Sequence, residues 1–530
     1  MGIRPELHAT PTGDGRYVFR PACYTLSKDE KRVFCQFLND LKVPDGYSSN
    51  ISRCVSLAEC KISGMKCHDC HVLLHRYLPL AIRGLLNKVA CEALLELCTY
   101  LRELCAKVLH FDDLERLEKS IPVTLCKLEK IFPPSIFDIM VHLTIHLASE
   151  AKVAGPVQFR WMYFVERYLR RLKSYVRNKA RPEGSIAEAY IVQECMHFCS
   201  RYLHGTETRL NRAGRNDGRN GVRSHSRLQV FSQVGESLIG NKYEELSLTE
   251  WAKARMYVLQ NCDEITEFVD MHKEKLREKD PRNVEGRHRD EFYEWFKTHV
   301  NQLHDEGSQM VNDELWNLAK GPDIRVHRHM SFLINGWRFN TKDRDLQLKT
   351  QNSGIFVKGD VNAGNLDYFG VLTDIIQLYY QGQNTVILFK ADWWDVHHKS
   401  GFKIDKFGFP MVNVTRKLKT NEPYVLASQA GQVYYVKDIK EPNWQVVVKT
   451  KPRDLYDLPK NDEPCQENED FGFTPHESTA EDDNDVMISL DRSDLEPATV
   501  EGNSSNIDVM GVEEDETDCD EDSFINDDDD

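Results

Sequence analysis

The sequence predicts an α+β protein with mainly helical N-terminal two-thirds, a small antiparallel β-barrel or β-sheet module, and a disordered acidic tail. Three observations predict this class. Apolar residues recur at three- and four-residue spacing from about residue 69 to 204. Short β-branched and aromatic runs, punctuated by glycines, begin near residue 362. After residue 460 apolar residues become too sparse to form a core.

Individual elements follow from capping and turn chemistry. A helix is predicted from Ser27 to Leu41, with Ser27 as its cap and Glu30 three positions later. Residues 43–46 then form a turn, and further helices cover 135–150, a stretch from Trp161, and most of 241–318. The predicted strands are 369–379, 385–391, 424–427, 433–436 and 446–449.

Charge is distributed unevenly along the chain. The net charge of the whole chain is −16, but residues 461–530 hold 27 Asp and Glu against the single Arg492, a balance of −26. The first 460 residues therefore carry +10. A basic body joined to an acidic tail is typical of a protein that binds a polyanion, with the tail as a competitor for the same surface.

The 15 cysteines are scattered and odd in number, which favours reduced thiols in the nucleus or cytosol over a disulfide framework. Cys91, Cys98 and Cys105 recur every seven residues and are interpreted as small packing residues. The first 16 residues lack the apolar core of a signal peptide, and no apolar run approaches the roughly 20 residues of a membrane span. Neither secretion nor membrane contact is expected.

The helix that begins at Trp161 has two faces of opposite character. Its apolar face consists of Val165, Tyr168, Leu169, Leu172, Tyr175 and Val176. Its other face places Glu166 at the head of a basic stripe, for which a phosphate backbone is the natural partner. The alternative is a solvated face whose Glu166–Arg170 pair contributes only about 0.3–0.5 kcal/mol. The predicted DNA-binding residues are Arg160, Arg167, Arg170, Arg171, Lys173, Arg177, Lys179 and Arg181.

Residues 181–188 are predicted to end this helix, turn, and begin another that Ser185 caps, with Glu188 at the third position. Glu183 in this stretch is a secondary candidate acid. No glycine-rich phosphate loop, nucleophile elbow or HExxH pattern is present, which excludes most familiar enzyme classes.

A second group of residues has the side chains of a zinc site. The candidate ligands are Cys70, His71, His142 and His146, with Cys67 and His68 as substitutes. Residues three apart at 67–71 supply one half of the site, and two histidines one helical turn apart supply the other. The alternative is that these histidines are hydrogen-bonded core residues.

Two long stretches carry a family resemblance. The segments GMKCHDCHVLLHRYLPLAIR, LCKLEKIFPPSIFDIMVHLTIHLASEA and GPVQFRWMYFVERYLRRLKSYVRNKARPEGSIAEAYI resemble the domain of unknown function that follows the core of plant CACTA (En/Spm) transposases. That resemblance covers roughly residues 30–205. The later segments DYFGVLTDIIQLYY, VILFKADWWDV and YVLASQAGQVYYVKD resemble a second, β-rich domain that usually follows it.

The resemblance implies part of an RNase H-like fold with a helical insertion, in which three acidic residues bind two divalent metals. Glu166 corresponds in character to the third acid, and the resemblance supports the zinc ligands named above. The first two acids are aspartates expected upstream of Met1. We therefore expect magnesium only if those aspartates are supplied, and a structural zinc ion as the other cofactor.

The implied division of the chain has six parts. These are a remnant of the transposase core at 1–62, a transposase-associated helical domain at 63–205, a basic flexible linker at 206–240, a charged helical segment at 241–330, a β-rich domain at 353–450 and a disordered acidic tail at 461–530.

The main hypothesis is a truncated transposase of the nucleus that binds DNA, at transposon ends or non-specifically, and cannot transpose alone. A transposase partner protein is a further expected contact. The alternative is a domesticated, non-catalytic nuclear regulator that binds DNA or protein. A zinc-stabilised helical scaffold is the third hypothesis.

Overall fold

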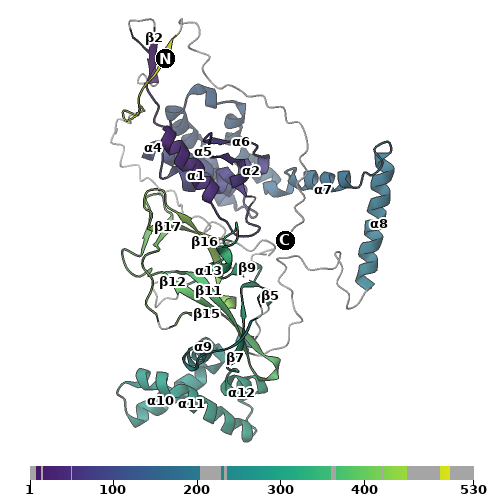
Figure 1. The fold of residues 1–530 in the computed structure, drawn as a ribbon, viewed down its shortest axis with the longest axis vertical. Coiled ribbons are helices and arrows are strands. Elements are labelled where there is room, and N and C mark those ends of the chain that lie inside the picture. Colours follow the sequence, from purple (N-terminus) through teal and green to yellow (C-terminus); the bar gives the residue numbers. More distant parts are fainter. Residues whose placement is uncertain are drawn as a thin grey trace.

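The computed structural model describes residues 7–12, 16–48, 50–202, 228–231, 235–240, 242–359, 366–420, 422–450 and 490–501. A helical block, an antiparallel sheet and a second group of helices follow one another along the long axis, and two helices project from the block to one side (Figure 1). The predicted α+β class is confirmed, and the sheet is open, with no closed barrel among the described strands. Of the predicted linker at 206–240, residues 206–227 lie outside the described residues, and Gly235–Ile239 form a strand.

The helical block is built from short helices and turns. Its elements are α1 (Lys28–Asp40), a 3₁₀ turn (Ile51–Cys54), β3 (Val55–Ser56), β4 (Lys61–Ile62), α2 (Cys67–Val72), a π-helical turn (Leu73–Tyr77), α3 (Leu78–Ile82), α4 (Lys88–Leu104), α5 (Phe111–Ile131), a 3₁₀ turn (Pro134–Ile136), α6 (Ile139–Ala154) and a 3₁₀ turn (Val157–Phe159). The predicted capping box is present: the Glu30 amide donates to Ser27 Oγ at 3.1 Å, and the Ser27 amide donates to Glu30 Oε2 at 2.8 Å.

The predicted turn at 43–46 is also present, since the Tyr47 amide donates to the Pro44 carbonyl at 3.1 Å and Gly46 has φ 75°. The helix predicted at 135–150 begins later, at Ile139. Its cap is Asp138, whose carboxylate accepts the Val141 amide at 3.0 Å, and a 3₁₀ turn occupies the preceding residues. Helices α4, α5 and α6 share a core that includes Tyr100, Ile121 and Ala148.

The main sheet contains ten strands, all paired antiparallel. They are β6 (Lys242–Glu245), β7 (Arg325–His329), β10 (Gly354–Val357), β11 (Tyr368–Tyr379), β12 (Thr385–Trp393), β13 (Phe402–Ile404), β14 (Pro410–Asn413), β15 (Tyr424–Leu426), β16 (Gly431–Lys437) and β17 (Trp444–Lys449). The long strand β11 is central: β10 and β7 pair with one edge and β12 with the other. A three-stranded sheet of β5 (Gly235–Ile239), β8 (Ser331–Ile334) and β9 (Trp337–Asn340) lies beside it, and a short helix, α13 (Lys342–Asp345), follows.

Strands β6 and β7 lie within the stretch that was predicted to be helical. Strand β6 reads Lys-Tyr-Glu-Glu and β7 reads Arg-Val-His-Arg-His, so neither shows the apolar alternation that predicts a strand. Their pairing depends on β11 and on Arg328, whose guanidinium contacts the carboxylates of Asp374 and Glu244. The strand assignment therefore comes from distant partners and not from local pattern.

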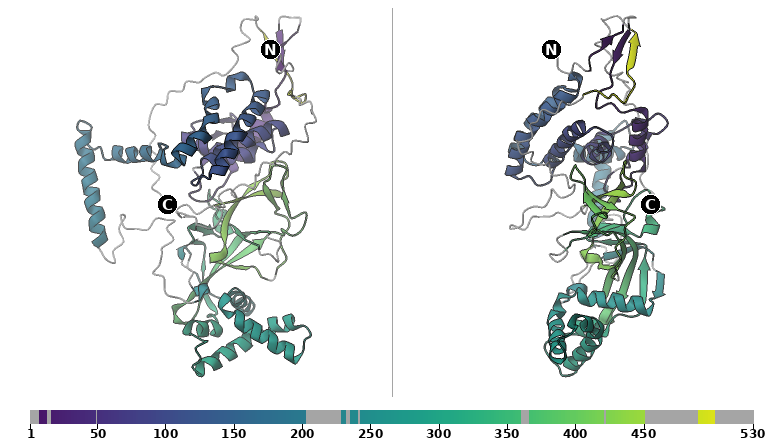
Figure 2. Two further views of the ribbon diagram at one scale, coloured as in Figure 1. Left: turned by 180° about the vertical axis from the view of Figure 1, so that it is seen from behind. Right: turned by 90° about the vertical axis from the view of Figure 1, so that its left-hand side faces the viewer.

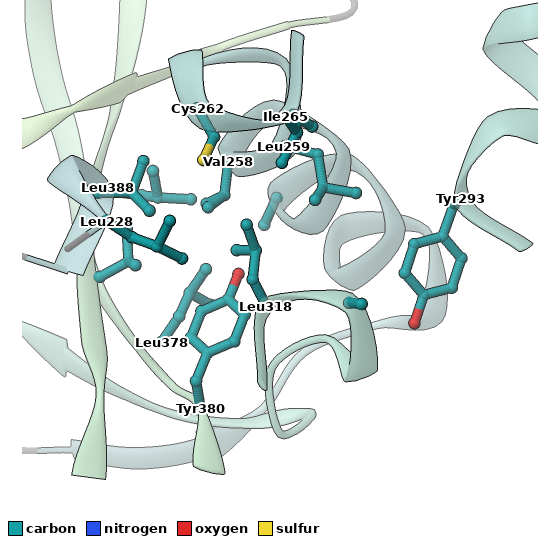
Figure 3. Close-up of a cluster of buried hydrophobic side chains, with 14 of the residues drawn as sticks. Leu228, Val258, Leu259, Cys262, Ile265, Tyr293, Leu318, Leu378, Tyr380 and Leu388 are labelled. Atoms are coloured by element: carbon teal, nitrogen blue, oxygen red, sulfur yellow. The ribbon is translucent and has the colours of Figure 1, made fainter. Parts of the chain in front are cut away.

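The second helix group covers one end of the sheet. It consists of α9 (Leu248–Gln260), a 3₁₀ turn (Asp263–Ile265), α10 (Thr266–Lys279), α11 (Val284–Asp305) and α12 (Asp313–Lys320). An earlier 3₁₀ turn (Gln229–Phe231) packs against the same core. Figure 3 shows Val258 and Leu318 from these helices facing Leu378, Tyr380 and Leu388 from the strands. Burial raises the pKa of the Tyr380 phenol far above its usual value. No helix in the described part of the chain is long and apolar enough to cross a bilayer.

The helical block rests on the opposite end of the sheet through a shared apolar core. Leu38, Tyr77 and Leu80 from the block are buried with Phe409 and Tyr434 from the sheet. The backbone joins the two parts as well, because the Gln351 amide donates to the Val43 carbonyl at 3.0 Å. Residues more than 300 positions apart thus form one hydrophobic core.

An ion-pair triad lies at this junction. Arg83 follows α3 and is 6% exposed, and its guanidinium contacts Asp405 Oδ2 at 2.6 Å and the carboxylate of Asp438. The second oxygen of each carboxylate accepts backbone amides, those of Phe407 and Phe409 for Asp405. Charges buried in this way stabilise a fold only while all partners are present.

Part of the acidic tail is ordered against the N-terminal region. Strand β18 (Ala498–Glu501) pairs with β2 (Arg16–Phe19), which also pairs with β1 (Thr10–Pro11). Arg492, the one cation of the tail, donates to Glu30 Oε2 at 2.6 Å, and Leu490 packs against the core of α4–α6. The rest of the predicted tail, at 461–489 and 502–530, lies outside the described residues.

Removal of the Arg83 side chain is expected to destabilise the protein strongly. An Arg83→Ala variant leaves two half-buried carboxylates without their cation, and loss of one partner of a fully buried pair costs about 3–5 kcal/mol, which is the upper end expected here. Chemical denaturation followed by circular dichroism measures the free energy of unfolding. The matched control is Arg32→Ala, because the exposed Arg32–Asp29 pair contributes roughly 0–1 kcal/mol. Equal effects in the two variants contradict a stabilising role for the triad.

Candidate functional site

Two helices, α7 (Tyr163–Ser174) and α8 (Pro182–Tyr202), project from the helical block. The positive charge that the sequence predicts lies on α7 and on the segments that flank it, whereas α8 is acidic. We call residues 160–202 the arm. In Figure 2, left, α7 extends away from the helical block and α8 crosses its far end. The base of the arm packs on the block through Gln158, whose side-chain amide donates to the Lys107 carbonyl at 3.4 Å.

The basic residues of the arm face solvent. Residues 160–181 contain eight Arg and Lys against one acid, Glu166, which gives the segment a charge of +7. The exposed side chains are those of Arg160, Arg170, Arg171, Lys173, Arg177, Lys179 and Arg181. The side chain of Arg167 lies outside the described side chains. Arg171 Nε donates to the Tyr175 hydroxyl at 2.9 Å, so this guanidinium also supports the helix end.

The predicted apolar face of α7 is only partly covered. Tyr168 and Leu169 are 47% and 56% exposed, whereas Leu172 is half-buried. Leu172 and Tyr168 line an open groove with Ile186 and Tyr190 of α8. The neighbouring Tyr168 raises the pKa of Tyr190. The arm is therefore held by contacts between its own two helices, and not by burial in the main core.

The start of α8 differs from the prediction. The helix begins at Pro182, a residue suited to a first helical position, so Ser185 lies inside it and does not cap it. The Ser185 hydroxyl instead accepts the backbone amide of Asn178 at 3.1 Å. Proline fixed the helix start three residues before the serine, which the capping-box pattern did not anticipate.

Glu166 is exposed in the first turn of α7. An acid at this end of a helix interacts favourably with the positive end of the helix dipole. Within the described ranges, Glu166 belongs to no group of three or more potential metal ligands, and neither does Glu183. The structure thus leaves Glu166 at the head of a basic helix, without two companion carboxylates among the described residues.

The predicted zinc ligands do not come together as one set. Cys67, His68 and Cys70 are exposed on α2, and His142 and His146 are exposed on α6 with ring centroids 5.4 Å apart. Asp69, between the predicted ligands, is 2% exposed and accepts a hydrogen bond from Arg53 at 2.8 Å. Asp69 therefore anchors the start of α2.

A different set does converge. His71, His75 and Cys105 have donor atoms within 4.8 Å of one another, and they are the one such group of His, Cys, Asp or Glu in the described part of the chain. Burial lowers the pKa of His75 to about 3 and also lowers that of His71, so both imidazoles are neutral near pH 7. Burial raises the pKa of the Cys105 thiol to about 11. His75 and Cys105 were missed because no regular spacing relates them.

Two family models match the chain. A domain of unknown function, DUF4218, matches residues 104–217, which include α5, α6 and the arm. A second domain of unknown function, DUF4216, matches residues 376–447, which include most of the main sheet from β11 to β17. No curated protein and no solved structure matches. The chain therefore carries two domains of unknown function, in this order, that are typical of plant transposase-derived proteins.

Proposed function

We propose that this chain derives from a CACTA-type (En/Spm) transposase, acts in the nucleus, and binds DNA through the basic side of the arm without transposing by itself. The two matched domains support the origin. The concentration of exposed Arg and Lys on α7 and its flanking segments supports DNA as the ligand, because a phosphate backbone is recognised first by such charge. We call the exposed Arg and Lys side chains of residues 160–181 the stripe, and they are the observation on which the proposal depends.

The basic side chains continue from α7 into the segment that follows it. Arg170 and Lys173 lie on α7, which ends at Ser174, and Arg177 lies three residues beyond that end, not on the helix face where the sequence places it. Each of these exposed cations is suited to a phosphate of a nucleic acid backbone. Contacts of this kind go to phosphates and carry no sequence information, so the arm alone predicts binding with little sequence preference.

Glu166 does not supply metal chemistry alone in this proposal. Strand transfer with two metal ions needs several carboxylates to hold both ions in place. The described residues group no such set around Glu166. Magnesium is expected to bind beside Glu166 only if further acidic residues are supplied there.

Neutralising the stripe is expected to weaken DNA binding and its dependence on salt. In an Arg170→Ala, Lys173→Ala, Arg177→Ala variant, each lost phosphate contact removes about 0.9 from the slope of log K against log salt concentration. Three contacts therefore correspond to a slope shallower by about 2.7. Fluorescence anisotropy with a labelled duplex, titrated at several salt concentrations, measures both affinity and slope.

The matched control neutralises Lys275, Arg277 and Lys279, three exposed basic residues of α10. Glu274 and Glu278 lie beside them in the same helix, so this surface is nearly neutral and a small effect is expected. Equal losses in the two triple variants, or no change in the arm variant, contradict an interface on the arm.

Removing residues 502–530 is expected to strengthen DNA binding and steepen its salt dependence. This segment holds 13 acidic residues, which compete with DNA for basic surface, and its removal keeps the contacts of residues 490–501 with α1 and β2. The same titration on the shortened chain is the measurement. Unchanged affinity at low salt contradicts competition by the tail.

The purified chain is expected to leave supercoiled plasmid intact in magnesium. Gel electrophoresis after incubation detects nicking, and a Glu166→Gln variant is the control for contaminating nuclease. Nicking that requires magnesium and disappears in Glu166→Gln would overturn the non-catalytic part of the proposal.

A further inference from the structure

We propose that His71, His75 and Cys105 form a zinc-binding site where α2, the π-helical turn and the end of α4 meet. The site differs from the set that the sequence predicts, since only His71 is common to both. It is also independent of the proposed DNA contact, because its residues lie in the helical block and not on the exposed stripe.

Local backbone structure holds the two histidines together. His71 lies in the last turn of α2, and His75 lies one turn later in the π-helical turn Leu73–Tyr77, where the Leu78 amide donates to the Leu73 carbonyl. Their ring centroids are 3.9 Å apart with an interplanar angle of 41°. Single π-helical turns are found frequently at functional sites, because the wider turn changes the direction of the side chains that follow.

Cys105 approaches from another helix. It caps the C-terminus of α4, and its amide donates to the Leu101 carbonyl at 3.1 Å, which fixes the backbone of the residue. Cys91 and Cys98, on the same helix, are fully buried and pack in the core, as predicted for all three cysteines. Cys105 is only half-buried and faces the histidines, so packing alone does not account for it.

The donor set selects zinc. Two imidazole nitrogens and one thiolate sulfur are ligands that zinc prefers, whereas magnesium and calcium prefer oxygen. In a tetrahedral zinc site such donors lie about 3.4–3.6 Å apart. The donors here lie within 4.8 Å, so small rotations of the three side chains bring them to that distance. No fourth His, Cys, Asp or Glu of the described residues joins the group, which leaves the fourth position to water.

The site also lies at the base of the arm. The ring of Trp161, two residues before α7, meets the His71 ring edge-on at 5.8 Å with an angle of 85°. Gln158 donates to the carbonyl of Lys107, two residues beyond Cys105. A metal that fixes His71 therefore also fixes the surface on which the start of the arm packs.

The experiment measures metal in the purified full chain. After dialysis against a small amount of zinc, elemental analysis is expected to give one zinc per chain, and competition with a chromogenic chelator gives the affinity. Cys105→Ser and His75→Gln are each expected to weaken zinc binding by more than roughly 100-fold, since loss of an outer-shell partner alone costs about 10–100-fold. Cys126→Ser, at an exposed cysteine of α5, is the matched control and is expected to retain zinc.

A His142→Ala, His146→Ala variant separates the two ligand sets and is expected to retain zinc. Cobalt substitution provides a second readout: the thiolate-to-cobalt absorption band is expected in the parent chain and absent from Cys105→Ser.

Circular dichroism verifies that each variant is folded, and His71→Gln replaces the buried His75 change if that variant unfolds. Absence of zinc from the parent chain overturns the site. Zinc loss from the His142/His146 variant with full retention in Cys105→Ser also overturns it.

Discussion

The positive charge of Arg83 is neutralised by Asp405 and Asp438, which lie 322 and 355 residues further along the chain. The buried guanidinium of Arg83 and two half-buried carboxylates meet at the contact between the helical block and the sheet, beside the apolar core that contains Leu38 and Tyr434. Coulomb attraction in such a site depends on geometry, because each ion has left water. The position of the helical block, and with it the base of the arm, depends on this junction.

The junction also shows that the matched domains are not independent folding units here. The second match includes Asp405 and Asp438, but the cation that neutralises them lies at Arg83, outside both matched ranges. Strand β7, which pairs with one edge of β11, and β6, which pairs with β7, also lie outside the second match. A fragment cut at the ends of that match would leave the carboxylates of Asp405 and Asp438 without their cation and would expose part of the edge of β11.

The sequence pattern predicted the structural elements that depend only on residues close together in the chain. The Ser27–Glu30 capping box and the apolar strands β11 and β12 are local, so propensity and spacing were sufficient. The pattern failed where a distant partner decides the structure, as in β7, whose polar residues pair with β11. The pattern missed the group of His71, His75 and Cys105 for the same reason, because these residues come from a π-helical turn and from the end of another helix. The sequence pattern also placed the basic residues on one helix that continues past Arg177, whereas α7 ends at Ser174.

The long separation at the Arg83 junction has a consequence for synthesis on the ribosome. Translation proceeds at about 5–20 residues per second, so Arg83 precedes Asp405 by roughly 15–65 seconds. During that interval the nascent helical block has no sheet to cover Leu38, Tyr77 and Leu80. A nascent chain with such apolar surface is a substrate for chaperones, and slower elongation upstream of codon 405 would lengthen its dependence on them.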